Sequence, residues 1–421
     1  MENILELFQN HISSYSKDLH NTIVEIHNKK INEYVDDQIN ISIIVICKNE
    51  ERVIERCIQA IMKDKDIKDE IIIIDTGSND KTIEKILKYR AQVNLFEQEW
   101  KENFSEIRNY GISKSIHDWT FFIDADEELV EGSIYSLKKY IWILKEVKLK
   151  NVVINPTIIN SNGHIVQGVR RIVNKKDNIY YYGLIHEEPR ISEDKFGKDI
   201  FEISFDNIQL KHDGYEQEIL EAKNKIERNI SLLRIMIDIE PYYPRWIYFL
   251  SRDGKEVLKK EEYEFLLQKT IKLCADNIDY KEYKIRALSD LVAYYIHQGK
   301  LKEAEEKLFE LKTIAPELSD VFYFQNIIKI INIKSSFFEI LNDVVTFKNN
   351  KQEIEYGSMH SNLFHMDYLI AELFFEIEEY DKAFNIFNKL EENHFSFNTQ
   401  KYKNLYNALE NSSYKKVINK T

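Results

Sequence analysis

The sequence is poor in cysteine, glycine and proline, and each shortage excludes a class of protein. Its three cysteines, Cys47, Cys57 and Cys274, are odd in number and widely spaced, which excludes a disulfide framework and a cysteine-rich metal knuckle. Only 11 of 421 residues are glycine and 5 are proline, as expected of a largely helical chain with short loops. No stretch approaches the roughly 18 consecutive apolar residues that a membrane span requires.

Basic residues are also outnumbered. There are 58 Lys and Arg against 71 Asp and Glu, a formal net charge of −13, which argues against nucleic acid or an anionic membrane as a partner. Residues 1–6 lack the basic and apolar regions of a signal peptide. We therefore expect a soluble, reduced, cytoplasmic protein of two or three domains.

Three apolar runs in the first half of the chain each end in a polar cluster. Residues 41–46 run into Cys47-Lys48-Asn49-Glu50, residues 71–74 into Asp75-Thr76-Gly77-Ser78, and residues 119–123 into Asp124-Ala125-Asp126. Continuous apolar runs are typical of strands covered by helices on both faces, and helices are expected at about 50–62, 80–89 and 104–115. This rhythm predicts an α/β domain with a mostly parallel sheet. Ligands of such sheets bind beyond the carboxyl ends of the strands, so the three clusters should share one crevice.

We expect three regions along the chain. Residues 1–38 have apolar positions at helical spacing and predict a helical extension, residues 39–216 form the α/β domain, and residues 217–421 are almost entirely helical.

The helical region contains a repeat. Residues 291–316 and 370–390 both match the offsets of a tetratricopeptide unit, with Ala304 and Ala383 at its small-residue position, and Trp246 opens a more degenerate unit. The two alanines stand 383 − 304 = 79 residues apart, which is not a multiple of about 34, so the array is irregular. Stacked helical hairpins suit peptide or protein binding, and a homodimer interface is the alternative role.

The paired carboxylates Asp124 and Asp126 suit a divalent cation, Mg²⁺ or Mn²⁺, that also holds phosphate oxygens. A solvated turn is the alternative. Asp75, with Gly77 and Ser78, would accept hydrogen bonds from a nucleoside, or else it serves only as a helix cap and in a tight turn.

Other residues complete the candidate site. Cys47, Asn49 and Glu50 would face the ribose and diphosphate together with Ala125, although Glu50 also suits the first turn of a helix. Arg108 would pair with the diphosphate or with an aspartate. Glu187, in His186-Glu187-Glu188-Pro189, suits a general base if burial raises its pKa. His186 and His212 are candidates for a nitrogen ligand of the metal, though single histidines are more often structural.

These segments together resemble family 2 glycosyltransferases of the GT-A fold, over about residues 40–215. They occur in the order IVICKNEE, IIIIDTGSNDKT, EWKENFSEIRN, DWTFFIDADEEL and GLIHEEP. With a tetratricopeptide-like second half, nearly the whole chain is similar to the glycocin S-glycosyltransferases of the sublancin and thurandacin type, which serve bacteriocin biosynthesis.

This resemblance implies an enzyme that transfers a hexose with inversion, usually glucose from UDP-glucose, to a cysteine thiol, and sometimes a serine, of a ribosomal precursor peptide. It assigns nucleoside contact to Asp75, metal and diphosphate binding to Asp124 and Asp126, and the acceptor base to the position of Glu187. The resemblance does not assign a role to His212; its role as a metal ligand is our separate interpretation.

Two other functions remain open at this stage. One is a transferase acting on lipopolysaccharide core or another surface glycan, although a glycan acceptor gives the helical half no obvious role. The other is a tetratricopeptide scaffold with an inactive transferase domain, against which the intact Asp124 and Asp126 argue.

Overall fold

The computed structural model describes residues 39–146, 148–166, 168–191, 200–212, 219–275, 277–350, 359, 362–395, 402 and 404. The helical extension expected for residues 1–38 lies outside these residues. The chain divides into two compact units, Met1–Tyr283 and Lys284–Thr421.

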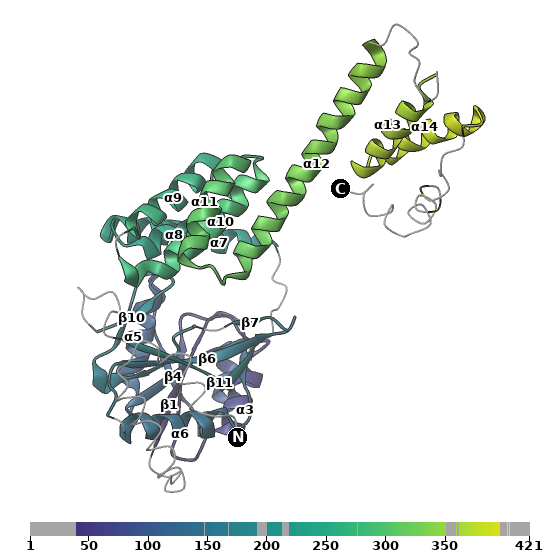
Figure 1. The fold of residues 1–421 in the computed structure, drawn as a ribbon. Helices are drawn as coiled ribbons and strands as arrows, with labels where there is room; N and C mark the ends of the chain where they lie inside the picture. The colour runs from purple at the N-terminus through teal and green to yellow at the C-terminus, as the bar shows by residue number, and fades with distance from the viewer. Residues whose placement is uncertain are drawn as a thin grey trace. The chain divides into compact units, whose positions relative to one another are not determined.

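The first unit is built on a mostly parallel sheet (Figure 1). Its described strands lie in the order β3-β2-β1-β4-β8-β6-β11-β5, with β7 paired to β6. The pairs β3-β2, β2-β1, β1-β4 and β6-β11 are parallel, whereas β8, β5 and β7 are antiparallel to their neighbours. The strands are β1 (Ile41–Cys47), β2 (Glu70–Asp75), β3 (Asn94–Glu97), β4 (Trp119–Asp124), β5 (Glu127–Leu129), β6 (Val152–Asn160), β7 (Ile165–Val166), β8 (Ile172–Asn174) and β11 (Phe201–His212).

Both faces of the central strands are buried, as the apolar runs predict. Residues alternate along β1, so that Ile43 belongs to the core under α3 (Ile54–Asp64), α4 (Thr82–Leu87) and α6 (Ser133–Glu146), whereas Ile44 belongs to the core under α5 (Phe104–Lys114). A small antiparallel sheet of β9 (Tyr180–Tyr182) and β10 (Glu188–Arg190) lies on the α5 side, where Tyr181 joins that core. The α/β fold with a mostly parallel sheet is thereby confirmed.

The helices of the first unit after the sheet are α7 (Ile219–Ile239), α8 (Pro244–Gly254) and α9 (Lys260–Leu273), followed by the short η5 (Ile278–Tyr280); η4 (Lys175–Asp177) lies earlier. Pro244 opens α8 at its first turn, where a proline costs no hydrogen bond, and Trp246 is fully buried behind it. The elements therefore change from strand to helix near residue 217, while the compact unit continues to Tyr283. The domain boundary at residue 217 stays a prediction.

The second unit consists of paired helices (Figure 1). After the first turn of α10 (Lys281–His297), they are α11 (Leu301–Ile314), α12 (Ser319–Asn350), α13 (Phe364–Glu376) and α14 (Tyr380–Glu392). Both expected repeats are helical hairpins, and their small residues Ala304 and Ala383 are fully buried. The 32-residue helix α12 lies between the two hairpins in the sequence, which explains their irregular spacing. Among the residues described, no helix combines the length and apolar character needed to cross a membrane.

Candidate active site

Strands β1, β2 and β4 bring the three polar clusters to one edge of the sheet. Cys47 at the end of β1 is in register with Asp75 at the end of β2, and Ile46 is in register with Asp124 at the end of β4. Because the three strands are parallel neighbours, their carboxyl ends point the same way. The expected meeting of the clusters is therefore observed.

The loops after β1 and β2 are joined by hydrogen bonds. The Asn49 N–H donates to Ser78 Oγ at 2.8 Å, the Asn79 N–H donates to Asn49 Oδ1 at 2.8 Å, and the Glu50 N–H donates to Thr82 Oγ1 at 2.7 Å. Asn49 adopts a left-handed backbone with φ 58°, a conformation that asparagine tolerates better than most residues. These bonds hold Asn49 and Ser78 together beyond the carboxyl ends of β1 and β2.

Asp75 stabilises its own turn. Its Oδ2 accepts the N–H groups of Gly77 at 3.0 Å and Ser78 at 2.9 Å, and the carboxylate is only 2% exposed. Gly77 itself has a φ of 101°, which a residue with a Cβ would adopt only with strain. The alternative interpretation of Asp75 as a turn residue thus has direct geometric support, and its role in nucleoside binding stays a prediction.

Cys47 faces inward. Its thiol is 3.7 Å from the Ile74 carbonyl oxygen and 3.8 Å from Asp75 Oδ1, and burial together with the Asp75 charge raises its pKa far above the usual range. The thiol is therefore neutral and buried, which leaves only main-chain atoms of Cys47 to contact a ligand.

Asp124 is held by Arg171, a residue that the sequence analysis did not identify. The two terminal nitrogens of Arg171 donate to the two carboxylate oxygens of Asp124, with Nη1 at 2.6 Å from Oδ1. Burial would raise the pKa of Asp124, but the Arg171 charge outweighs burial and holds that pKa below its usual range. Asp124 is therefore ionised and already neutralised by a cation of the protein.

Glu127 lies inside the fold and supports the same turn. It is 2% exposed, and its Oε2 accepts the Asp124 N–H at 2.8 Å. Burial raises its pKa to about 7, against the lowering effect of Arg171. Glu127 thus fixes the backbone of the Asp124-Ala125-Asp126 turn from inside, where the Ala125 side chain is also buried.

Asp126 and His212 lie together at the exposed side of this turn. His212 Nε2 is 3.2 Å from Asp126 Oδ2, and His212 Nδ1 is 3.0 Å from Asn160 Oδ1. Suppose that His212 Nδ1–H donates its hydrogen bond to Asn160. The other ring nitrogen, Nε2, and the Asp126 carboxylate then either share a proton or together bind a cation.

This arrangement fits a divalent cation, although it is incomplete as a protein-only site. Two ligand atoms in adjacent octahedral positions, each about 2.1 Å from Mg²⁺, are about 3 Å apart, close to the separation of Asp126 Oδ2 and His212 Nε2. No group of three or more His, Cys, Asp or Glu side chains that would hold a metal occurs among the described residues. Phosphate oxygens and water would have to supply the other ligands, as is usual for Mg²⁺.

Glu187 forms an ion pair with Arg108 on the α5 side of the sheet. Arg108 Nε donates to Glu187 Oε1, and the guanidinium lies 4.9 Å from the Phe122 ring centre and 5.3 Å from that of Tyr181. Burial favours a higher pKa for Glu187, but Arg108 more than offsets burial, and the net shift is downward. The prediction that burial raises the pKa of Glu187 is therefore wrong. The sequence alone does not show that Arg108 is its ionic partner.

His186 belongs to a different contact. Its Nε2 is 2.6 Å from Asp253 Oδ2 of α8, and its ring stacks on Phe249 with centres 4.4 Å apart. The carbonyl oxygen of His186 also accepts a hydrogen bond from Arg245 Nη2 at 2.7 Å. His186 thus connects the β9–β10 loop to α8. Of the two candidate histidines, His212 is the one that lies next to Asp126.

Glu50 is half-buried, and the negative charges of Asp126, Asp80 and Asp124 act on its carboxyl group. Burial, and then the charge of Asp126, raises its pKa to about 7. Near neutral pH the Glu50 carboxyl is therefore partly protonated.

Comparison with known proteins agrees with this geometry. Residues 42–198 match the family described as glycosyl transferase family 2. The chain is 24% identical to the SPbeta prophage-derived glycosyltransferase SunS of Bacillus subtilis (strain 168), over 95% of this chain and 91% of the relative. It is also 36% identical to a TPR repeat-containing protein of Synechococcus elongatus, over 21% of each chain.

A crystal structure of Staphylococcus aureus TarS in complex with UDP-GlcNAc aligns with a TM-score of 0.36 and 14% identity, over 65% of this chain and 91% of that one. The family match spans the strand ends at Cys47, Asp75 and Asp124 as well as Arg171 and Glu187. Residues 42–198 thus match glycosyl transferase family 2, and nearly the whole chain is similar to SunS.

Proposed function

We propose that the chain is an inverting peptide S-glycosyltransferase. It would move a hexose, glucose from UDP-glucose, to a cysteine thiol of a ribosomal bacteriocin precursor, with serine as a poorer acceptor. The proposal is supported by the family 2 domain, by the alignment with SunS over almost the whole chain, and by the resemblance to glycocin S-glycosyltransferases.

The observation that carries the catalytic part is the contrast between the two aspartates. The two side chains are similarly exposed, 44% for Asp124 and 42% for Asp126, but Asp124 is neutralised by Arg171, whereas Asp126 lies next to His212. Asp126 and His212 would hold a divalent cation against the diphosphate, with Asp75, Asn49, Gly77 and Ser78 next to the nucleoside. When bound, such a cation stabilises the negative charge that develops on the leaving diphosphate.

Glu187 is the proposed base. As the sulfur of the acceptor bonds to C1 of the hexose, the C1–O bond to the diphosphate breaks, UDP leaves, and the thiol proton passes to a carboxylate. The ion pair with Arg108 keeps Glu187 deprotonated but makes it a weak base. A thiol, with a pKa of about 8.5, tolerates a weak base better than a hydroxyl does, so this geometry favours cysteine over serine.

The test is transfer in solution from a panel of UDP-sugars to a cysteine-containing precursor and to its Cys→Ser analogue. We expect a mass gain of one hexose on the cysteine peptide with UDP-glucose, and slower transfer to serine. Transfer to glycan acceptors only would indicate a surface-glycan enzyme. UDP binding with no transfer to any acceptor would indicate a scaffold.

Glu187→Gln tests the base. The variant keeps the shape of the side chain, so UDP binding should be unchanged, while the transfer rate should fall about 100-fold or more. The fall should be larger for serine than for cysteine. Near-normal transfer to serine would exclude Glu187 as the base.

A further inference from the structure

The proposed base ends a short loop, and the residue on each side of it is anchored to the same helix. Residues 183–187 connect β9 to β10, and Glu187 pairs with Arg108 of α5. The side chain of His186 contacts α8, and that of Glu188 contacts the N-cap of α8. Glu187 therefore lies between two residues held by α8, while its own side chain reaches α5.

His186 is held through its ring. The ring stacks on Phe249, and His186 Nε2 lies 2.6 Å from Asp253 Oδ2. Asp253 is only 10% exposed, and its other oxygen accepts a hydrogen bond from Arg252 Nε at 2.9 Å. Phe249 and Asp253 are four residues apart on α8, so they lie on one face of the helix and hold the ring together.

The backbone of His186 adopts an unusual conformation. Its φ is 49°, in the left-handed region that residues with a Cβ rarely adopt. Such a conformation costs free energy and persists only where the surrounding contacts hold it. Arg245 supplies such contacts, since its Nε and Nη2 donate to the His186 carbonyl oxygen at 3.2 and 2.7 Å. Because His186 directly precedes Glu187, this backbone conformation sets the direction of the Glu187 side chain.

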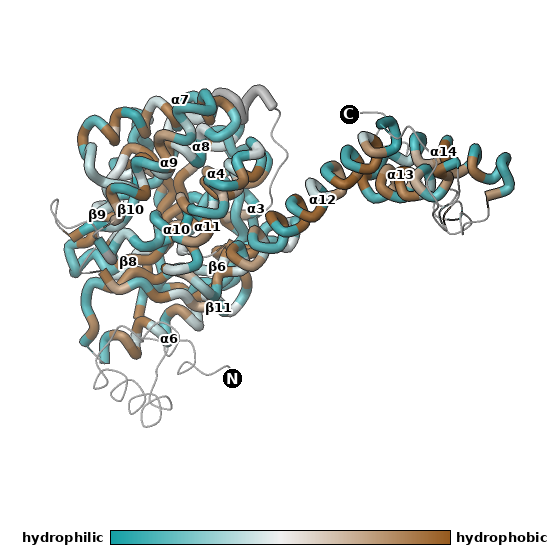
Figure 2. Tube along the Cα trace, turned by 45° about the horizontal axis from the view of Figure 1, so that its top comes forward, coloured by the Kyte–Doolittle hydropathy of each residue, from teal (hydrophilic) through white to brown (hydrophobic). Residues whose placement is uncertain are grey.

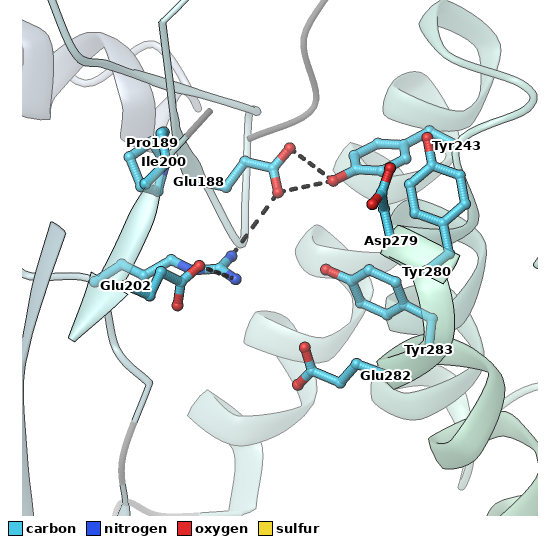
Figure 3. A pocket seen from close by; sticks show the side chains of 10 residues that line it. Glu188, Pro189, Ile200, Glu202, Tyr243, Asp279, Tyr280, Glu282 and Tyr283 are labelled. Atoms are coloured by element: carbon cyan, nitrogen blue, oxygen red, sulfur yellow. Dashed lines mark hydrogen bonds and ion pairs between the residues drawn. The ribbon is translucent and has the colours of Figure 1, made fainter. Parts of the chain in front are cut away.

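The residue after Glu187 is held from the same helix. The Nε group of Arg245, which donates to His186, also lies 3.4 Å from Glu188 Oε2. The hydroxyl of Tyr243, the N-cap of α8, lies 2.9 Å from each carboxylate oxygen of Glu188 (Figure 3). Tyr243 and Arg245 are both buried, so these contacts are shielded from water.

The start of the loop is fixed as well. Gly183 packs so closely on Trp246 of α8 that an added Cβ would lie 2.7 Å from the ring. The carbonyl oxygen of Leu184 accepts the N–H of Phe104, the first residue of α5, at 3.0 Å. The loop is therefore fixed between α8 and α5, and all three segments belong to the same compact unit.

We propose that His186 and Asp253 are positioning residues that hold Glu187 where it can take the proton of the acceptor thiol. This inference rests on the proposed role of Glu187 as the base. Neither residue needs to touch a substrate, because Asp253 fixes the His186 ring and His186 fixes the backbone next to the base. Proton transfer requires hydrogen-bond reach, and a displacement of about 1 Å can cost up to about 100-fold in rate.

Asp253→Asn is the first variant, because it removes the charge and keeps the size of the side chain. In the full chain, we expect kcat for the cysteine peptide to fall about tenfold, and more for its Cys→Ser analogue, because a hydroxyl depends more on a base. The KM for UDP-glucose and the affinity for UDP should not change, since the proposed donor contacts lie at the ends of β1, β2 and β4. Rates are expressed per UDP-binding site, so that unfolded protein is not counted.

Glu262→Gln is the matched control. It removes the charge of an ion pair between helices of the same unit, in which Glu262 Oε1 lies 2.7 Å from Arg234 Nη2. This pair joins α9 to α7, so kcat should be unchanged. An equal fall in kcat in the control and in Asp253→Asn would overturn the proposal.

His186→Asn is the second variant. Asparagine tolerates the left-handed backbone but has no ring to stack on Phe249. We expect kcat to fall to the same extent as in Asp253→Asn, and the double variant to lose no more than either single variant, because the two residues act as one unit. Losses that add in the double variant would contradict this coupling.

The decisive readout combines Asp253→Asn with Glu187→Gln. Without the carboxylate there is no base to position, so Asp253→Asn should not lower the residual kcat of Glu187→Gln any further. A tenfold loss in both backgrounds would show a general structural effect and overturn the proposal. Slow transfer by Glu187→Gln with normal kcat in Asp253→Asn and His186→Asn would overturn this inference alone, whereas near-normal transfer by Glu187→Gln would overturn the base assignment as well.

Discussion

At the scale of single residues, Arg171 determines how the two aspartates differ. Its fork geometry matches the Asp124 carboxylate, and its Nη2 also lies 3.5 Å from Glu127 Oε1. Without this arginine, the buried Glu127 and the partly exposed Asp124 would lose the cation that pairs with both. Arg171 therefore stabilises the turn that presents Asp126 to a ligand.

Arg171→Met should destabilise the protein by about 3 kcal/mol, because it leaves the buried carboxylate of Glu127 without this cation. Arg56→Met is the matched control, since Arg56 pairs with Glu128 at 2.7 Å but both side chains are 36% exposed. The control should cost less than about 1 kcal/mol. Denaturant unfolding monitored by circular dichroism measures both, and equal losses would contradict the role assigned to Arg171.

Asp126→Asn should abolish transfer and remove the dependence of UDP affinity on Mg²⁺ or Mn²⁺. The paired Asp126 and His212 provide the reason, because a neutral amide is a much weaker ligand for a hard cation. Calorimetry of UDP binding with and without metal gives the measurement, and Glu128→Gln is a nearby control. Equal UDP affinity of the wild-type protein in both conditions would exclude the metal role.

Glu50→Gln should change how stability depends on pH. The folded protein raises the pKa of Glu50 from an ordinary 4.5 to about 7, so between these values the folded state binds more protons than the unfolded state. The contribution of Glu50 to stability is therefore fully present below about pH 4.5 and is lost as pH rises towards 7. Melting temperatures from pH 4.5 to 8 should show the wild type losing stability relative to Glu50→Gln, and parallel curves would contradict this assignment.

At the scale of helices and strands, local patterns predicted much of the fold. The apolar runs at β1, β2 and β4 have the length and continuity of buried strands, and Ala304 and Ala383 mark the tight crossings of the two hairpins. Helix starts were less accurate, since α3 begins at Ile54 and not near residue 50. The N–H groups of Glu50 and Glu51 instead donate to Thr82, the first residue of α4, and to Asp80 just before it.

The missed parts of the site depend on contacts between distant residues. Arg171 is 47 residues from Asp124, and Asp253 is 67 residues from His186. No local periodicity distinguishes these side chains from exposed ones. The Arg170-Arg171 pair after an apolar-poor segment was the available signal, because buried carboxylates at a strand end require cations from elsewhere in the chain.

Gly183→Ala tests how closely the β9–β10 loop approaches α8. Gly183 has a φ of 116°, and a Cβ there would lie 2.7 Å from Cη2 of the buried Trp246 ring. We expect a loss of about 2–4 kcal/mol from strain and overpacking together. Gly163→Ala, with a φ of 80° and no atom within 4 Å of the added Cβ, should lose only about 1 kcal/mol. Similar losses measured by denaturant unfolding would show that the contact with Trp246 is unimportant.

At the scale of the whole molecule, the second unit offers a surface that the chemistry of the first does not use. Helix α12 carries exposed apolar side chains at Ile330, Ile333, Ile340 and Phe347, a spacing that puts them on one side of the helix. Figure 2 shows that hydrophobic residues recur along α12. Its Lys334 and Lys348 pair with Glu378 and Asp367, so α12 also contacts the α13–α14 hairpin. An amphipathic helix of a precursor peptide, or a second copy of this chain, would cover such a surface.

The last prediction is that the helical region after about residue 220 binds the precursor peptide through its leader, while the first part of the chain holds the donor. Binding there would raise the local concentration of the flexible acceptor segment at the active site and lower KM without changing the chemistry. On the intact enzyme, full-length precursor should therefore show a lower KM than its isolated core, with a similar kcat. Ile333→Ser/Ile340→Ser should remove this difference without changing the KM of the core. If precursor and core behave alike, and sedimentation shows that the same substitutions dissociate a dimer, the apolar side of α12 is a subunit interface and not a docking site for the peptide.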